Sequence, residues 1–122
     1  MSTRANIVMT DGETKLWAYR HSDGYPRCAG ESLIEFCKGY KTGKMRGNPI
    51  QSMGHLILHG HNEYKSAGLL ESDYMKWKIG AYEITDGEHG DIEYLYTIDL
   101  DAKKLFCRDL YENKTTTLFD WN

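Results

Sequence analysis

The sequence predicts an α+β domain in which two helices pack on one face of an antiparallel sheet of about five to six strands. Two apolar patterns with helical spacing lie in the middle of the chain, and strand-like runs flank them on both sides. The predicted order is ββααβββ(β), with the last strand at an edge of the sheet. At 122 residues, the chain fits a single domain over residues 1–122.

A β-hairpin is expected at the beginning of the chain. Arg4–Thr10 and Thr14–Arg20 contain β-branched and aromatic residues. Asp11-Gly12 between them can supply the positive φ angles of a tight turn. The second strand is expected to end at His21–Pro26, because this segment is rich in turn-forming residues.

Two helices are expected next. Apolar residues in Cys28–Tyr40 recur at i, i+3, i+4 and i+7, which places them on one helical face. Asn48-Pro49 resembles a helix start, with Asn as the cap and Pro at the first position. Helical spacing continues after it, although Gly54 and Gly60 each weaken a helix by about 1 kcal/mol relative to Ala. A short strand over Gly54–His59 is the alternative.

The last third of the chain is expected to be sheet. The predicted strands are Met75–Thr85, Ile92–Leu100, Lys103–Leu110 and a short edge strand, Thr115–Phe119. Apolar residues alternate along the second of these runs, which is typical of a strand with one buried face. The turn-rich segment Asp86–Asp91 is expected to close a hairpin between the first two.

Composition excludes several classes of protein. No apolar run approaches the ~18–20 residues of a membrane span, and the first residues lack a signal peptide's apolar core, so we expect a cytoplasmic protein with no membrane association. The odd cysteine count (Cys28, Cys37 and Cys107) indicates reduced thiols rather than a disulfide framework. A net charge of −3 and a pI near 5.9 argue against binding a nucleic-acid polymer.

Charge is unevenly distributed along the chain. Residues 1–61 carry eight Lys or Arg and five Asp or Glu, a balance of +3, whereas residues 62–122 carry seven and thirteen, a balance of −6. Opposite charges could bring one half of the chain against the other half of a second copy. Two solvated surfaces that differ in charge are the alternative.

The residues do not form a pattern typical of catalysis or metal binding. His55, His59 and His61 lack the glutamate of a zincin helix, and the third would point roughly 200° around the helix from the second. The cysteines have no base at a recognised catalytic spacing, and glycine-rich phosphate-binding patterns are absent. We therefore expect no enzyme, metal or cofactor.

Aromatic and basic residues form the most informative cluster. Arg20, His21, Tyr25 and Arg27 surround the loop that follows the second strand. Arginine offers forked donors to a phosphate and tyrosine offers a stacking surface, so these residues suit an anionic ligand with a flat base. A structural turn held by Asp23 and Tyr25 is the alternative.

A second candidate pocket lies on the predicted C-terminal sheet. Arg108 could face Tyr82 and Tyr94 from the preceding strands and offer the same combination of cation and ring. A surface arginine above an aromatic sheet face is the alternative.

The chain resembles a known protein family in two segments. They are Ser2-Thr3-Arg4-Ala5-Asn6-Ile7 and Tyr19-Arg20-His21-Ser22-Asp23-Gly24-Tyr25-Pro26. With the length and element order, they resemble the first described family of Thoeris anti-defence sponges, from phages and mobile elements. The resemblance implies a non-enzymatic protein that binds cyclic ADP-ribose isomers made by host TIR-domain proteins and holds them intact. It also implies cyclic oligonucleotides as ligands at a separate site, and a homo-oligomer (dimer or hexamer) with pockets between protomers.

The family's pocket is not matched here position by position, so the candidate residues above rest on their chemistry alone. Sequestration requires an affinity near −12 kcal/mol, about nanomolar. One arginine–phosphate pair and one stacked ring do not reach this on an open surface, which predicts a site enclosed between protomers.

A protein-binding inhibitor is the main alternative function, such as an anti-CRISPR or an acidic nucleic-acid mimic. The acidic residues that could imitate a row of phosphates are Asp86, Glu88, Asp91, Glu93, Asp99 and Asp101. A hydrolase or a housekeeping domain is a third alternative.

Overall fold

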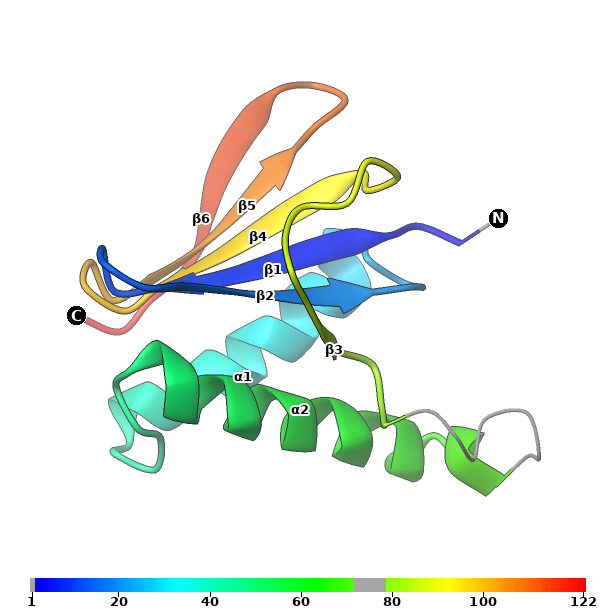
Figure 1. The fold of residues 1–122 in the computed structure, drawn as a ribbon, viewed down its shortest axis with the longest axis horizontal. Coiled ribbons are helices and arrows are strands. Elements are labelled where there is room, and N and C mark those ends of the chain that lie inside the picture. The colour runs from blue at the N-terminus through cyan, green and yellow to red at the C-terminus, as the bar shows by residue number, and fades with distance from the viewer. Residues whose placement is uncertain (1, 72–78) are drawn as a thin grey trace.

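The computed structural model describes residues 2–71 and 79–122 and has two layers (Figure 1). One layer is a six-stranded sheet, and the other consists of two α-helices that cover one face of the sheet. The sheet face that contacts the helices is called the inner face below, and the opposite face the outer face. This architecture confirms the predicted α+β class.

The elements follow the predicted order closely. Their bounds are β1 Ala5–Thr10, β2 Lys15–Arg20, a π-helical turn η1 Pro26–Gly30, α1 Glu31–Lys41, α2 Pro49–Ser66, a 3-10 turn η2 Leu69–Glu71, β3 Glu83–Thr85, β4 Tyr94–Asp99, β5 Lys104–Asp109 and β6 Lys114–Asp120.

The segment after Asn48 forms a helix, so the alternative strand over Gly54–His59 is wrong. Asn48 caps α2, because its Oδ1 accepts a hydrogen bond from the backbone N–H of Gln51 at 2.9 Å. Pro49 occupies the first helical position, where its missing N–H costs nothing. Within the described part of the chain, neither α-helix combines the length and apolarity needed to cross a bilayer.

The sheet is mixed, although an antiparallel sheet was expected. The strand order is β3-β2-β1-β4-β5-β6, and the β1–β4 pair is parallel while the other pairs are antiparallel. The prediction that Asp86–Asp91 closes a hairpin is therefore wrong. Strand β3 pairs with β2 at one edge and β4 pairs with β1, so this segment is a crossover above β2 and β1.

Asn6 and Tyr19 hold this crossover on the outer face. The buried Asn6 amide donates to the carbonyl of Ala18 at 2.8 Å and accepts from the N–H of His89 at 2.6 Å. The Tyr19 ring stacks on His89 with 4.0 Å between centroids, and its hydroxyl donates to Asp91 at 2.8 Å. A buried amide must find hydrogen-bond partners, and here the backbones of β2 and of the crossover supply them.

The predicted strand Met75–Thr85 is present only in its last three residues, Glu83–Thr85, which form β3. Residues 75–78 lie outside the described residues. The segment 79–82 contacts α2 instead of extending the strand, with the N–H of Ala81 donating to the carbonyl of Gly60 at 3.1 Å.

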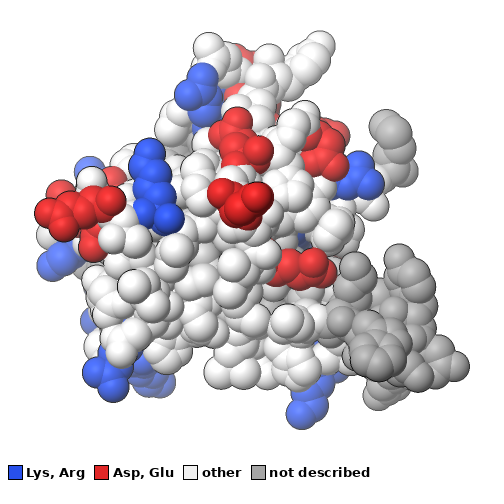
Figure 2. All heavy atoms as spheres, in the orientation of Figure 1, with Lys and Arg blue, Asp and Glu red and all other residues white. Residues whose placement is uncertain are grey.

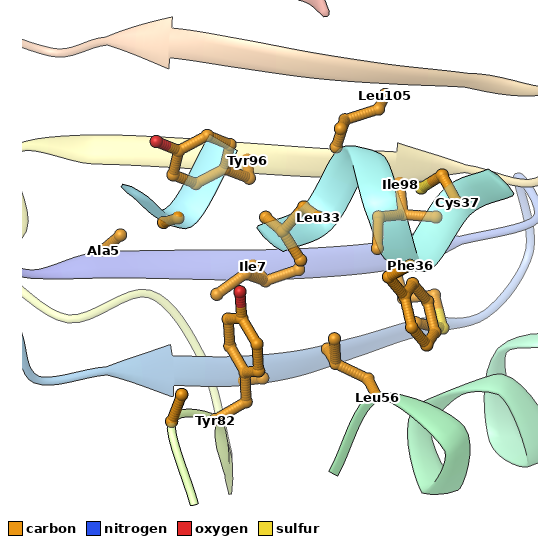
Figure 3. Close-up of a cluster of buried hydrophobic side chains, with 14 of the residues drawn as sticks. Ala5, Ile7, Leu33, Phe36, Cys37, Leu56, Tyr82, Tyr96, Ile98 and Leu105 are labelled. Carbon is orange, nitrogen blue, oxygen red and sulfur yellow. The ribbon is translucent and has the colours of Figure 1, made fainter. Parts of the chain in front are cut away.

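The core lies between the inner face and the helices (Figure 3). It is built by alternate residues of the central strands and by one apolar stripe on each helix, as the sequence pattern predicted. The sheet contributes Ile7, Ala18, Tyr96, Ile98, Leu105 and Cys107, and the helices contribute Leu33, Phe36, Cys37, Met53 and Leu56. All three cysteines are unpaired.

Candidate functional site

The structure separates the predicted site residues into several locations. Arg20 and Tyr82 meet beneath α2, Tyr94 lines a cleft beside Tyr25 and Arg27, and His21 and Arg108 lie elsewhere on the sheet. Each location is described in turn, because its geometry decides what these side chains can bind.

Arg20 is buried and bound to protein groups. Its guanidinium forms a two-point ion pair with the Glu63 carboxylate, at 3.2 Å and 2.7 Å. It also donates to the Tyr82 hydroxyl at 3.0 Å and to the carbonyl of Ser22 at 2.9 Å. With 3% of its surface exposed, Arg20 links β2 to α2 and to the segment before β3.

A polar network continues from this ion pair into the helical layer. The Tyr82 hydroxyl donates to Ser32 Oγ at 2.7 Å, and Ser32 Oγ donates to Glu63 Oε1 at 2.7 Å. Burial raises the pKa of Tyr82 to about 12, so its hydroxyl stays protonated at neutral pH.

Ser32 and His59 resemble a nucleophile and its base, but their hydrogen bonds do not fit that role. His59 Nε2 lies 3.2 Å from Ser32 Oγ and 2.9 Å from the Ser32 carbonyl oxygen. A carbonyl only accepts, so Nε2 carries the hydrogen and cannot take a proton from Ser32. The pair is therefore not arranged for nucleophilic catalysis.

A cleft of about 280 Å³ opens between η1 and the last three strands. We call it the η1–β6 cleft. Its lining residues come from η1, from three strands and from the turn before β6: Pro26, Tyr94, Cys107, Asp109, Glu112, Lys114, Thr116 and Leu118.

Strand register builds one wall of the η1–β6 cleft. Tyr94 on β4 pairs with Asp109 on β5, and Asp109 pairs with Lys114 on β6, so the three side chains form one row across the sheet. An irregularity in β6 leaves Leu118 as an extra residue between the partners of Leu105 and Phe106. Leu118 is therefore free to line the cleft.

Glycine at position 30 lets η1 approach this sheet closely. A Cβ on Gly30 would lie 3.3 Å from Leu118 Cδ1 and 3.5 Å from the Pro26 Cβ. The preceding loop is held by the Tyr96 hydroxyl, which donates to the carbonyl of Gly24 at 2.7 Å. The opposite wall of the cleft is therefore placed by the close packing at Gly30 and by this hydrogen bond.

The lining of the η1–β6 cleft combines three kinds of group. Tyr94, Pro26 and Leu118 offer apolar surface, and Lys114 offers a cation. The carboxylates are Asp109 and Glu112; Asp109 Oδ1 accepts the backbone N–H of Glu112 at 3.1 Å. This combination suits a polar ligand that has a flat ring, hydroxyl groups and an anionic group.

Cys107 also lines the cleft but is poorly suited to attack a ligand. It is 5% exposed, and burial raises the pKa of its thiol. The thiol therefore stays protonated at neutral pH, and the thiolate is the nucleophilic form.

Tyr25 and Arg27 flank Pro26 at the cleft. The guanidinium carbon of Arg27 lies 5.4 Å from the centroid of the Tyr25 ring, a cation–π distance. Among the described residues, no acidic side chain pairs with the exposed Arg27. The Tyr25 hydroxyl donates to Asp23 at 3.3 Å, so the turn of the alternative interpretation is present as well.

Arg108 does not join the other members of its predicted pocket. It pairs with Leu95, whereas Tyr94 pairs with Asp109, so Arg108 and Tyr94 are on opposite faces of the sheet. Its guanidinium donates to the Asn113 side chain. With Tyr82 beneath α2, no single pocket contains the three residues.

His21 lies at the end of β2 near the β3 edge. Its Nε2 is 3.7 Å from a carboxylate oxygen of Glu83, and its ring meets the Tyr19 ring edge-on with 4.5 Å between centroids. His21 is therefore separated from Arg20, whose side chain is on the inner face with that of Ala18.

The acidic residues of the alternative function form two groups. Asp86, Glu88, Asp91 and Glu93 belong to the crossover before β4 and its approach to the sheet. Asp99 and Asp101 lie at the opposite end of β4, a six-residue strand that is roughly 20 Å long.

The histidines near the end of α2 form hydrogen bonds with other groups of the fold. His61 Nδ1 lies 2.8 Å from the carbonyl oxygen of Ile79, and His59 contacts Ser32. In the described ranges, no group of three or more His, Cys, Asp or Glu is placed to hold a metal ion.

Comparison of this chain with protein-family models, with curated proteins and with solved structures finds no match.

Proposed function

We propose that this protein binds small cyclic nucleotides in the η1–β6 cleft and sequesters them without cleaving them. Cyclic ADP-ribose isomers are the first ligands to test and cyclic oligonucleotides the second, and both come from the family resemblance. The observation that carries the proposal is the row formed by Tyr94, Asp109 and Lys114, with apolar walls on either side.

Each part of the cleft matches one part of a nucleotide. The Tyr94 ring can stack on a base, since every base has a flat π face. The carboxylates of Asp109 and Glu112 can accept hydrogen bonds from ribose hydroxyls. Lys114 can pair with a phosphate, and Arg27, next to Pro26 in the chain, can supply a forked donor.

The size of the cleft supports a site completed by a second copy. About 280 Å³ is close to the lower end of ligand pockets, which run from roughly 300 to 1,000 Å³. One protomer thus covers only part of a molecule as large as cyclic ADP-ribose. Enclosure within a dimer or a hexamer would exclude water and strengthen each polar contact.

The biological role follows from the resemblance and is part of the same proposal. A phage-encoded protein with this activity acts in the host cytoplasm and removes the signal that a TIR-domain protein makes. Sequestration needs tight binding and no bond cleavage, so the cleft requires no catalytic residue.

Calorimetric titration with cyclic ADP-ribose isomers tests the site. We expect wild-type protein to bind, and Tyr94→Leu and Lys114→Ala each to weaken binding at least about tenfold, through loss of stacking and of the phosphate partner. Lys104→Ala is the matched control, because this residue is on β5 with Asp109 but on the outer face. Equal affinity in all four proteins, or no binding by wild type, would overturn the proposal.

A further inference from the structure

The helical layer has an uncovered groove on its side away from the sheet. Two adjoining hollows of about 260 and 440 Å³ lie along α1 and α2 and share Glu35, His59 and Asn62. Leu58 lines the groove and is 56% exposed, and Ile50 on the same helix is 72% exposed. Leu58 therefore adds exposed apolar surface to the groove.

The two ends of the groove differ in charge. Its acidic lining residues, Glu31, Glu35 and Glu63, come from the start of α1 and the end of α2. Lys44, in the loop that joins the two helices, lines the other end. The charge of the groove therefore changes sign along its length.

The sequence of the helical layer also separates acidic from basic residues. Residues 36–62 contain no Asp or Glu and four cations, Lys38, Lys41, Lys44 and Arg46. In Figure 2, Lys and Arg side chains gather at the end of the helical layer where the loop between α1 and α2 lies, at the lower left.

Several of these charges have no oppositely charged partner among the residues that the structure describes. Lys38 pairs with Glu35 at 3.3 Å, and Glu63 pairs with Arg20. Within residues 2–71 and 79–122, no oppositely charged side chain pairs with Glu31, Lys41, Lys44 or Arg46.

We propose that the groove is the interface between two copies of this chain. A two-fold axis across the middle of the helical layer would place the basic end of each copy on the acidic end of the other. Such a contact is self-complementary, covers Leu58 and brings Lys41 and Lys44 to Glu31 of the partner copy. The chain therefore carries both the basic and the acidic side chains that this two-fold contact would pair.

This interface does not rest on the proposed ligand or on the η1–β6 cleft. It uses the helical layer, whereas the cleft lies between η1 and the β4–β6 side of the sheet. An assembly that contains this two-fold contact and is larger than a dimer needs a second, different interface.

A pair of charge-reversal variants tests the interface. One variant combines Glu31→Lys with Glu35→Lys, and the other combines Lys41→Glu with Lys44→Glu. Each variant alone would place like charges at both contacts, so its mass in solution at about 50 mM salt should fall to half that of wild type or less. An equimolar mixture of the two should regain the wild-type mass, because each then meets its complement.

The combination Asp86→Lys with Glu88→Lys is the control. It makes the same charge change on exposed residues of the crossover and should keep the wild-type mass. Light scattering after size-exclusion chromatography gives the masses, and circular dichroism checks the fold. A monomeric wild type at about 100 µM, variants that keep the wild-type mass, or a mixture that does not recover would each overturn the proposal.

Discussion

The structure gives Arg20 a different role from the one that its sequence context suggested. In the sequence it is an arginine beside a histidine and a tyrosine in a turn-rich loop, which suits an anion. In the structure its guanidinium binds the Glu63 carboxylate and the Tyr82 hydroxyl and is 3% exposed. An arginine in this position contributes first to the attachment of α2 to the sheet.

Replacing Arg20 should therefore reduce stability. Arg20→Ala removes the donor to the Tyr82 hydroxyl and leaves the Glu63 carboxylate with the Ser32 hydroxyl but without its cation, so we expect the free energy of unfolding to fall by about 2–3 kcal/mol. The value is below that of a fully buried pair because the Glu63 side chain is 30% exposed. Urea unfolding measures it, with the exposed Arg27→Ala as the control; equal stability of the two variants would contradict this role.

The raised pKa of Tyr82 predicts how the free energy of unfolding changes at alkaline pH. Its pKa is raised from 10.0 to about 12, first by burial, so the unfolded chain loses this proton at lower pH than the folded protein. The contribution of Tyr82 to the free energy of unfolding should be level below pH 10 and then fall by about 1.4 kcal/mol per pH unit up to pH 12. Burial also raises the pKa of Tyr40 and Tyr96, which steepens the decline.

The measurement is denaturant unfolding at a series of pH values from 8 upward, compared between wild type and Tyr82→Phe. The variant loses two hydrogen bonds, with Arg20 and Ser32, but also the titrating group, so its stability should decline less steeply above pH 10. Parallel curves for the two proteins would show that Tyr82 does not titrate as expected.

Helix α2 illustrates what local sequence patterns can and cannot predict. Its start at Asn48-Pro49 and its apolar spacing were sufficient to place it, in spite of Gly54 and Gly60. The difference between the two glycines was not visible in the sequence, because it depends on whether a segment far along the chain packs against each one. At Gly60 the backbone of residues 81 and 82 approaches closely, whereas Gly54 faces open space.

These two glycines give a matched prediction within one helix. Gly54→Ala should raise the free energy of unfolding by about 1 kcal/mol, because alanine is the better helix former. Gly60→Ala should lower it by about 1–3 kcal/mol, since the new Cβ would lie 2.8 Å from the Tyr82 ring. Urea unfolding of both variants checks this, and effects of the same sign would contradict the packing at Gly60.

The sheet shows where pairing between distant segments decides the outcome. The β4 pattern predicted a strand with one buried face, and Tyr96 and Ile98 are fully buried. The segment before it has the composition of a hairpin loop and nevertheless crosses two strands, since Asn6 and Tyr19 bind it from the other end of the chain. Such contacts leave no local pattern in the sequence.

The same limit applies to the candidate site. Tyr94 was predicted as a ligand-binding residue from its chemistry, but its neighbours Asp109, Glu112 and Lys114 were not. They become neighbours only through the register of β4, β5 and β6, which no single segment reveals. A cross-strand row of ring, carboxylate and cation would have been detectable only after strand pairing was known.

At the scale of the whole molecule, charge and shape indicate two surfaces with different tasks. The helical groove changes sign along its length and fits a second copy of the chain. The η1–β6 cleft combines a ring, carboxylates and a cation, and we propose that it binds a nucleotide. In the functions that we propose, the two surfaces together would form a small assembly that retains a signalling molecule without cleaving it.

Retention can be measured directly by mass spectrometry. Purified protein is mixed with cyclic ADP-ribose isomers, washed by filtration and heat-denatured, and the released supernatant is analysed, with Tyr94→Leu protein treated in parallel. We predict intact cyclic ligand from the wild type and little from the variant. An unretained ligand, or release of a hydrolysed product, would contradict sequestration in this cleft.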